Sequence, residues 1–268
     1  MKKDYRGILI CTDYDGTLAW DGVSEDNIAA IEDFKKHGGL FTLATGRANY
    51  EISPDILPVK PNAPVVCAIG SRIYDLDGNK SLMDSVMEPE CAEIVVKAAL
   101  AMPCLGSASI YRANGREHIT DISEEGIVKG FSGFGGDVLK VVYWLTENYT
   151  AELFHKIAEI CGDRCNLCSN REDILEITAP GVHKGTAVAK LKELTGAEIL
   201  ITAGDTNGDI PMLLAADIGY AVENAANEVK AAADRITVHA KDSALAKIIA
   251  DIDKMLETER EHAEKSLS

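Results

Sequence analysis

The sequence predicts an α/β protein built on a doubly wound parallel sheet, with a second α+β module inserted into it. Short, nearly continuous apolar runs alternate with amphipathic helical segments near both ends of the chain, as in a parallel sheet that is covered on both faces. The alternation breaks between residues 82 and 179, where helices and short strands mix. It resumes at residue 183. We therefore expect a core domain of residues 1–81 and 180–268 and an inserted domain of residues 82–179.

The first stretch of the core contains three apolar runs and one helix. Ser24 is placed to cap a helix whose apolar stripe is Ile28, Ile31 and Phe34, and the glycine pair 38–39 ends it. A hairpin is expected at Asp77-Gly78. The strands are predicted at 7–12, 40–44 and 65–69.

The same apolar patterns predict the helices and strands of the insert and of the second stretch of the core. In the insert we expect helices over 89–101 and 151–161 and strands around Ser109 and at 138–145 and 174–177. After residue 183 the order is helix 185–194, strand 199–203, helix 209–216, strand 218–222, helix 228–233, strand 236–239 and a long terminal helix. The last twelve residues are strongly charged and are expected to fray.

Composition excludes several classes of partner. The chain has 27 basic and 43 acidic side chains, a formal charge of −16, which repels nucleic acid and anionic membranes. No apolar run approaches the roughly 20 residues of a membrane span. Seven cysteines in mostly apolar contexts indicate reduced thiols and a cytoplasmic protein. The expected partner is a small molecule, and the oligomeric state, monomer or homodimer, stays open.

Four polar clusters follow strand ends or open a helix. Ligands of parallel sheets bind beyond the carboxyl ends of the strands, so the fold is expected to gather these clusters into one crevice. The clusters are Asp13-Tyr14-Asp15-Gly16-Thr17, Thr45-Gly46-Arg47, Lys184-Gly185-Thr186 and Gly204-Asp205 through Asp209.

The residue types in these clusters suit phosphoryl transfer. Carboxylates of Asp13 and Asp205, with a backbone carbonyl, are oxygen ligands of the kind that Mg²⁺ prefers. Asp13 is then placed to attack phosphorus, while Asp15 protonates the leaving oxygen and later activates water. Thr45 and Lys184 would hold the oxygens that are not transferred. The hypothesis is magnesium-dependent hydrolysis of a phosphate ester.

These motifs resemble the four signature motifs of the haloacid dehalogenase (HAD) superfamily, over about residues 7–240. The large insert after the third strand resembles the Cof-type branch, subfamily IIB, in which a Rossmann-like core carries a type C2 cap and the usual substrates are sugar phosphates. By this resemblance Asp13 is the nucleophile, and Asp15 is the general acid/base and, through its carbonyl, a metal ligand. An aspartate at position 15 also favours a phosphatase over a dehalogenase.

The resemblance further implies that Thr45, Gly46 and Lys184 bind the substrate phosphate. It assigns the magnesium ion to Asp205, with Asp209 assisting. The expected partner is thus a small phosphorylated metabolite, which is hydrolysed through an aspartyl-phosphate intermediate.

Two positions depart from the pattern of the branch. Gly208 stands where asparagine is usual, with Asn207 one residue early, and Ile69-Gly70 replaces the usual Asn-Gly. These changes are expected to shift phosphate contacts to Asn207 or Asn224. They keep two alternatives open: a sugar phosphomutase, and a phosphate-sensing regulatory protein with a weakened site. A receiver domain shares the acids, threonine and lysine, but it has about half this length and no insert.

Three further features have open interpretations. Cys161, Cys165 and Cys168 share the spacing of the iron–sulfur site of radical S-adenosylmethionine enzymes, with His155 as a further zinc ligand. A strand over 165–169 would instead direct Cys165 and Cys168 to opposite faces and disfavour a metal. The segment GFSGFGGD (130–137) is either a lip over the substrate or a flexible turn. Trp20 either packs under the insert or lines its entrance.

Overall fold

A five-stranded parallel sheet forms the centre of the core in the computed structural model, which describes residues 3–52 and 57–266. Its strand order is β13-β12-β11-β1-β2, and every neighbouring pair is parallel. The chain leaves β1 toward β2 and later returns through β11 on the other side of β1, so the sheet is doubly wound. The strands are β1 (Ile8–Thr12), β2 (Leu40–Leu43), β11 (Ile199–Gly204), β12 (Ile218–Ala221) and β13 (Arg235–Ile236).

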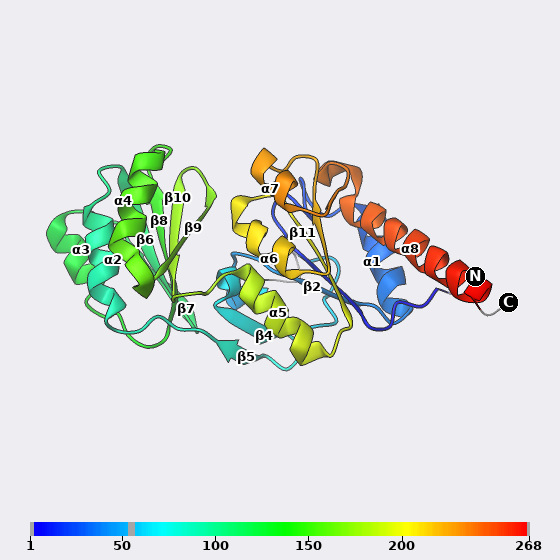
Figure 1. The fold of residues 1–268 in the computed structure, drawn as a ribbon. Helices are drawn as coiled ribbons and strands as arrows, with labels where there is room; N and C mark the ends of the chain where they lie inside the picture. The colour runs from blue at the N-terminus through cyan, green and yellow to red at the C-terminus, as the bar shows by residue number, and fades with distance from the viewer. Residues whose placement is uncertain (1–2, 53–56, 267–268) are drawn as a thin grey trace.

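Helices cover both faces of this sheet (Figure 1). Ile8 and Ile10 of β1 belong to the apolar cluster that contains α1 and α8, whereas Leu9 and Cys11 pack in the cluster that contains α5 and α6. Burial on both faces explains why the strand is apolar at every position. The helices are α1 (Glu25–Lys36), α5 (Lys184–Thr195), α6 (Ile210–Ala215), α7 (Asn227–Ala232) and α8 (Ala244–Ser266).

Local signals fix the ends of these helices. The Ser24 side chain accepts a hydrogen bond from the Asn27 amide at the start of α1, and Gly196 ends α5 in the left-handed conformation with φ 67°. The start of α1 matches the prediction, and α5 ends one residue beyond the predicted position 194. The structure continues α8 to Ser266, through residues that were expected to fray. Single 3₁₀ turns occur at η1 (Asn49–Glu51), η2 (Ala68–Gly70), η3 (Gly162–Arg164), η4 (Asn207–Asp209) and η5 (Ala240–Asp242).

The third predicted strand is shorter than expected and belongs to a different sheet. β3 (Val65–Cys67) pairs antiparallel with β4 (Arg72–Asp75), which forms the predicted hairpin with β5 (Lys80–Asp84). The isolated Ala44–Val66 bridge connects β3 to the end of the parallel sheet. The strand ends early because residues 68–70 all take positive φ values, which β-strand backbone cannot adopt. The predicted boundary at residue 82 falls inside β5.

The insert is an antiparallel sheet of order β7-β6-β8-β10-β9 with helices on one face. Figure 1 shows α2, α3 and α4 on the side of this sheet that faces away from the core. Its other face is therefore directed toward the parallel domain. The elements are α2 (Cys91–Leu100), β6 (Leu105–Arg112), β7 (Gly115–Ile119), α3 (Glu124–Gly130), β8 (Val138–Leu145), α4 (Ala151–Cys161), β9 (Asn166–Arg171) and β10 (Ile174–Thr178).

Sequence reasoning missed β7 and α3. β7 is an edge strand with mostly exposed polar side chains, so it lacks the apolar alternation that marks a half-buried strand. α3 is only seven residues long and contains two glycines. The glycine-rich segment 130–137 follows it. There Phe131 is buried in the core of the insert and the Gly133 carbonyl accepts a hydrogen bond from Arg112, so this segment is anchored to the insert.

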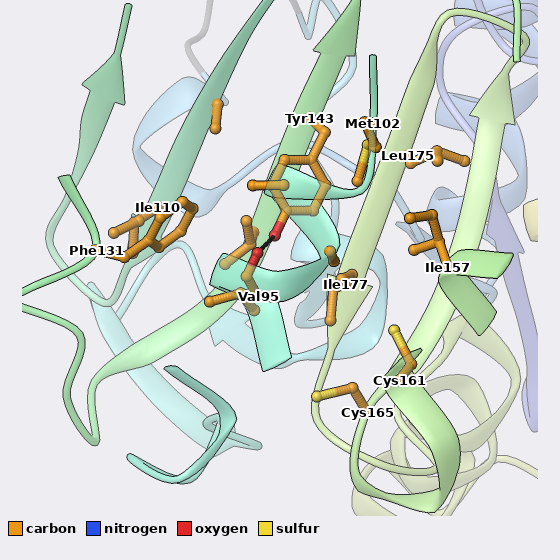
Figure 2. Packing of buried hydrophobic residues seen from close by; sticks show 14 of the residues in the cluster. Val95, Met102, Ile110, Phe131, Tyr143, Ile157, Cys161, Cys165, Leu175 and Ile177 are labelled. Carbon is orange, nitrogen blue, oxygen red and sulfur yellow. Dashed lines mark hydrogen bonds between the residues drawn. The ribbon is translucent and has the colours of Figure 1, made fainter. Parts of the chain in front are cut away.

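The cysteines of the insert separate as a strand predicts. Cys161 and Cys165 lie among the apolar side chains between the sheet and its helices, close to Tyr143, whose hydroxyl donates to the Val95 carbonyl (Figure 2). The Cys168 thiol instead donates to the Glu176 carbonyl at 3.7 Å and lines a cavity on the core side. Across the described residues, no group of these thiols and histidines is tight enough to hold a metal ion. The metal interpretation of these cysteines therefore has no structural support.

Trp20 contacts the core. The Trp20 ring, 45 % exposed, packs edge-on against His239 with ring centroids 4.6 Å apart, so its neighbour is a core residue rather than the insert. Over residues 3–52 and 57–266, none of the helices combines the length and apolarity that crossing a membrane requires.

Candidate active site

Three carboxylates converge at the carboxyl end of the parallel sheet. Asp13 follows β1 and Asp205 follows β11, and these two strands are neighbours in register, so the turns that leave them start side by side. The Asp13 amide donates to the Ala203 carbonyl at 2.9 Å, which continues the pairing of the two strands up to Asp13. Asp209 closes the single turn η4. One carboxylate oxygen from each of the three lies within 4.8 Å of the others.

Lys184 joins two of these acids. It is the first residue of α5, and its Nζ lies 2.6 Å from Asp13 Oδ1 and 2.6 Å from Asp209 Oδ1. The residue is only 2 % exposed. Burial disfavours the ammonium, but Asp13 and Asp209 together raise the pKa of Lys184 above its ordinary value. A cation at a helix N-terminus is unfavourable by itself, and the two carboxylates offset that cost.

The second oxygen of Asp209 organises the loop that presents Asp205. Asp209 Oδ2 accepts hydrogen bonds from the Asp205 amide at 3.1 Å and from the Thr206 amide and hydroxyl at 2.9 Å each. Asp205 Oδ1 accepts from the Thr17 hydroxyl at 2.6 Å. Asp209 thus uses both oxygens within the protein, and it holds Asp205 in place toward Asp13.

Gly16 permits the close approach of Asp205. Its φ is +85°, and a Cβ atom at this position would lie 2.5 Å from Asp205 Oδ2. A side chain here would displace the carboxylate, in addition to straining the backbone. The glycine of the first motif is therefore explained by its neighbour from the fourth.

Burial and the crowding of like charges raise the pKa values of two of the acids. Burial, together with Asp209 and Asp205, raises the pKa of Asp13 to about 8, against the opposing effect of Lys184. Burial and Asp209 raise the pKa of Asp205 to about 6. Three carboxylates with one lysine carry excess negative charge, and hard oxygen donors at this separation are the ligands of a small divalent cation. The donor set fits Mg²⁺, with Asp13 and Asp205 as carboxylate ligands and Asp209 beside them.

The Asp15 carboxylate lies outside this cluster. Arg47 holds it with two bonds, Nη2 to Oδ1 at 2.7 Å and Nε to Oδ2 at 3.0 Å, and the Asp15 side chain is 62 % exposed. The guanidinium also lies over the Tyr14 ring, 5.4 Å from its centroid. The Asp15 carboxylate therefore lies at the rim, and the metal contact expected from Asp15 through its carbonyl stays a prediction.

The loop Thr45-Gly46-Arg47 borders the cluster. Thr45 is buried, its hydroxyl accepts from the Arg47 amide at 3.2 Å, and its own amide donates to the Val66 carbonyl at 2.9 Å. The Ala68 amide donates to the Arg47 carbonyl at 2.8 Å. The left-handed residues after β3 thus brace this loop from the core side.

A cavity of about 540 Å³ lies between these residues and the insert. Its floor includes Asp13, Lys184 and Asp205, and Thr206, which the sequence reasoning did not select, also lines it. The insert contributes the opposite wall, which sequence reasoning missed entirely. These wall residues are Tyr111, Lys140, Val142, Trp144, Arg171, Ile174 and Glu176. The available signal was a single charged residue in each of two otherwise apolar strands, Lys140 in β8 and Glu176 in β10.

Asn207 is not brought to this cavity. Together with Gly208, Ile69 and His183 it lines a separate cavity of about 440 Å³. The two cavities are separated at the one-turn helix η4: Thr206, just before it, lines the cavity beside Asp13, whereas Asn207, its first residue, lines the other cavity. Asn224 is used structurally: its amide donates to the Gly16 carbonyl at 2.8 Å and accepts from the Ala240 amide. Neither Asn207 nor Asn224 is among the described residues that line the cavity beside Asp13.

The comparisons with known proteins agree with this arrangement. Two bacterial relatives are each 27 % identical to the chain. One is an HMP-PP phosphatase of Klebsiella pneumoniae, matched over 83 % of this chain and 86 % of its own length. The other is a 5-amino-6-(5-phospho-D-ribitylamino)uracil phosphatase of Bacillus subtilis, matched over 92 % and 96 %.

Among solved structures, a sugar phosphatase of HAD subclass IIB superposes with a TM-score of 0.76 at 18 % identity, covering 91 % of this chain and 98 % of that one. A haloacid dehalogenase-like hydrolase from B. subtilis gives 0.74 at 18 % identity, covering 90 % and 98 %. At these identities the likeness shows the fold. The family model for haloacid dehalogenase-like hydrolases matches residues 10–249, which include all four motifs. The chain therefore belongs to the haloacid dehalogenase-like hydrolase family.

Proposed function

We propose that this protein is a magnesium-dependent phosphatase that hydrolyses small phosphate monoesters, with sugar phosphates as substrates, through an aspartyl-phosphate on Asp13. The observation that carries the proposal is the convergence of Asp13, Asp205 and Lys184 on the floor of one cavity, with the buried Asp209 carboxylate bonded to Lys184 and close to the other two acids. Two further elements support it, the Thr45 loop beside the cluster and an acid, Asp15, at the rim.

In the first step a carboxylate oxygen of Asp13 attacks phosphorus and the ester P–O bond breaks. Asp15 gives a proton to the leaving oxygen. Lys184 and the Thr45 hydroxyl bind the phosphoryl oxygens while negative charge redistributes over them. Magnesium, held by Asp13 and Asp205, would supply positive charge that offsets the acidic cluster and the phosphate.

In the second step water attacks the phosphorus atom of the aspartyl-phosphate. The proton of the water passes to Asp15, the bond between phosphorus and Asp13 breaks, and inorganic phosphate leaves. The insert, residues 82–179 in the predicted division, acts as a cap in this scheme, because its sheet forms the wall opposite the acids and limits the access of bulk water.

The cap wall supports a small substrate. A volume of about 540 Å³ suits a metabolite rather than a polymer. The Trp144 side chain offers an aromatic surface for the C–H face of a sugar ring, and Arg171 and Arg47 add positive charge. The two relatives are named as phosphatases of small phosphorylated metabolites and one structural neighbour as a sugar phosphatase, which supports the same class.

The test is release of inorganic phosphate from a panel of phosphorylated metabolites with and without magnesium. We expect turnover of one or more sugar phosphates that stops on chelation with EDTA and returns when excess Mg²⁺ is added. A phosphomutase would instead need a bisphosphate activator and would yield an isomeric sugar phosphate. Complete absence of phosphate release over the panel, with phosphate binding retained, would replace the proposal by the sensing alternative.

Arg47 supplies a further prediction. Since Arg47 holds the Asp15 carboxylate with two bonds, Arg47→Met should leave that acid without a fixed position and lower kcat by about tenfold. Arg47→Lys, which keeps the charge but not the two-pronged geometry, should recover only part of the loss. Steady-state kinetics with an aryl phosphate measures both, and an unchanged kcat in Arg47→Met would show that the ion pair has no part in catalysis.

A further inference from the structure

A buried ion pair lies on the face of the insert that is directed toward the core. Lys140 of β8 and Glu176 of β10 are 3 % and 5 % exposed, with Nζ 2.6 Å from Oε1. Alternate residues of β8 divide between the two faces: Val141, Tyr143 and Leu145 pack in the cluster that contains the helices, whereas Val142 and Trp144 line the catalytic cavity with Lys140.

The same ammonium reaches across to the core. Lys140 Nζ donates to the Gly46 carbonyl at 2.8 Å and lies 4.6 Å from the centroid of the Tyr111 ring. Gly46 stands between Thr45, the expected phosphate ligand, and Arg47, the partner of Asp15. Residues 45 and 47 are bonded to core residues 66 and 68, and Gly46 is bonded to the insert. The loop is therefore held from both sides of the cavity.

The surroundings of the pair explain why its location matters. Removing two charges from water is expensive, and a buried ion pair often gains little stability over apolar residues of similar size. The surroundings of the pair are partly apolar, since Tyr111, whose ring the Lys140 ammonium contacts, forms an apolar cluster with Val142 and with Ala48 of the core. Unlike apolar residues, the charged pair supplies a hydrogen-bond donor, the Lys140 ammonium, that can bind the Gly46 carbonyl.

We propose that Lys140 is a positioning residue for the phosphatase reaction: held by Glu176, it binds the Gly46 carbonyl and so couples the seating of the cap to the geometry of the Thr45–Arg47 loop. This inference rests on the proposed function. Lys140 acts through the loop, whose residues contact the phosphoryl group and orient Asp15. Seating of the cap and completion of the phosphate site are then one event.

The test compares four proteins. Lys140→Met/Glu176→Gln removes the donor and neutralises the carboxylate that faces it, and Lys140→Arg retains a donor. Arg112→Met is the matched control, since Arg112 forms ion pairs with Glu117 and Asp137 within the insert and does not touch the loop. Each variant and the wild type are measured for kcat and KM with an aryl phosphate, for inhibition by inorganic phosphate, and for hydrogen exchange of the backbone amides of residues 45–47.

We expect the double variant to lose about tenfold in kcat and to bind inorganic phosphate about tenfold more weakly, as removal of one charge-assisted hydrogen bond predicts. Amide exchange at 45–47 should accelerate by a similar factor. Lys140→Arg should recover most of each loss, and Arg112→Met should match the wild type.

Kinetic constants and exchange rates within twofold of the wild type in the double variant would overturn the positioning role. So would equal losses in Arg112→Met, since these would reflect general loosening of the insert. The exchange measurement needs no turnover, so it decides the positioning role even for a wild-type protein that releases no phosphate, an outcome that would count against the proposed function alone.

Discussion

Replacing Asp13 by asparagine is expected to lower phosphate release by about a thousandfold or more. An amide oxygen is a poor nucleophile toward phosphorus, and no other side chain in the described part of the cluster is placed to substitute for it without losing its own contacts, because Asp209 is bonded to Lys184 and the Thr206 loop. The measurement is phosphate release from an aryl phosphate under saturating Mg²⁺.

The fold should survive this substitution. Lys184 keeps Asp209 as a partner, and one of three crowded carboxylates is neutralised. Thermal unfolding of Asp13→Asn should therefore occur near that of the wild type. Asp33→Asn, on the surface in a pair with Lys3, serves as the matched control and should retain full activity. If Asp13→Asn keeps more than about a tenth of the rate, Asp13 is not the nucleophile.

Replacing Lys184 by methionine is expected to have the second large effect, on stability as well as on activity. The ammonium is the shared partner of Asp13 and Asp209, both buried, and its removal leaves two like charges in a poorly solvated site. Breaking a buried pair from one side typically costs about 3–5 kcal/mol. We expect a loss of this order in the free energy of unfolding without Mg²⁺, measured by urea denaturation, and no detectable phosphate release.

A double substitution separates charge from packing. Lys184→Met/Asp209→Asn removes one of the two carboxylates that the lysine had neutralised, so it should be more stable than Lys184→Met by about 1 kcal/mol or more. Lys192→Met is the control on the same helix, since Lys192 pairs with Asp217 at the surface and should cost no more than about 1 kcal/mol. Similar stabilities of Lys184→Met and Lys192→Met would show that the buried pairs do not stabilise the fold.

The elements that sequence reasoning found best are those with the strongest local signals. β8 and α4 were predicted with the bounds they have, because a largely apolar run and an amphipathic stretch are readable without tertiary information. The runs ending at Thr12 and Ala203 were predicted as strands of one parallel sheet, and their adjacency in the structure is what brings Asp13 and Asp205 together. β3 was predicted too long, because a branched residue, Ile69, favours a strand locally whereas its backbone is left-handed.

By itself, the sequence determined the fold class and the acids and lysine of the floor. Both follow from short-range patterns. Short, nearly continuous apolar runs indicate strands of a parallel sheet that is covered on both faces, and polar residues follow these runs at the carboxyl ends, which a parallel sheet collects at one edge. Only the tertiary structure decided that Asp15 faces Arg47 at the rim, that Asn207 lies beyond the catalytic wall, and that Lys140 reaches Gly46. The Asp15–Arg47 contact joins residues 32 positions apart, and the Lys140–Gly46 contact joins residues 94 positions apart. Such contacts depend on how a turn rotates its side chains and how two sheets face each other, which no local pattern encodes.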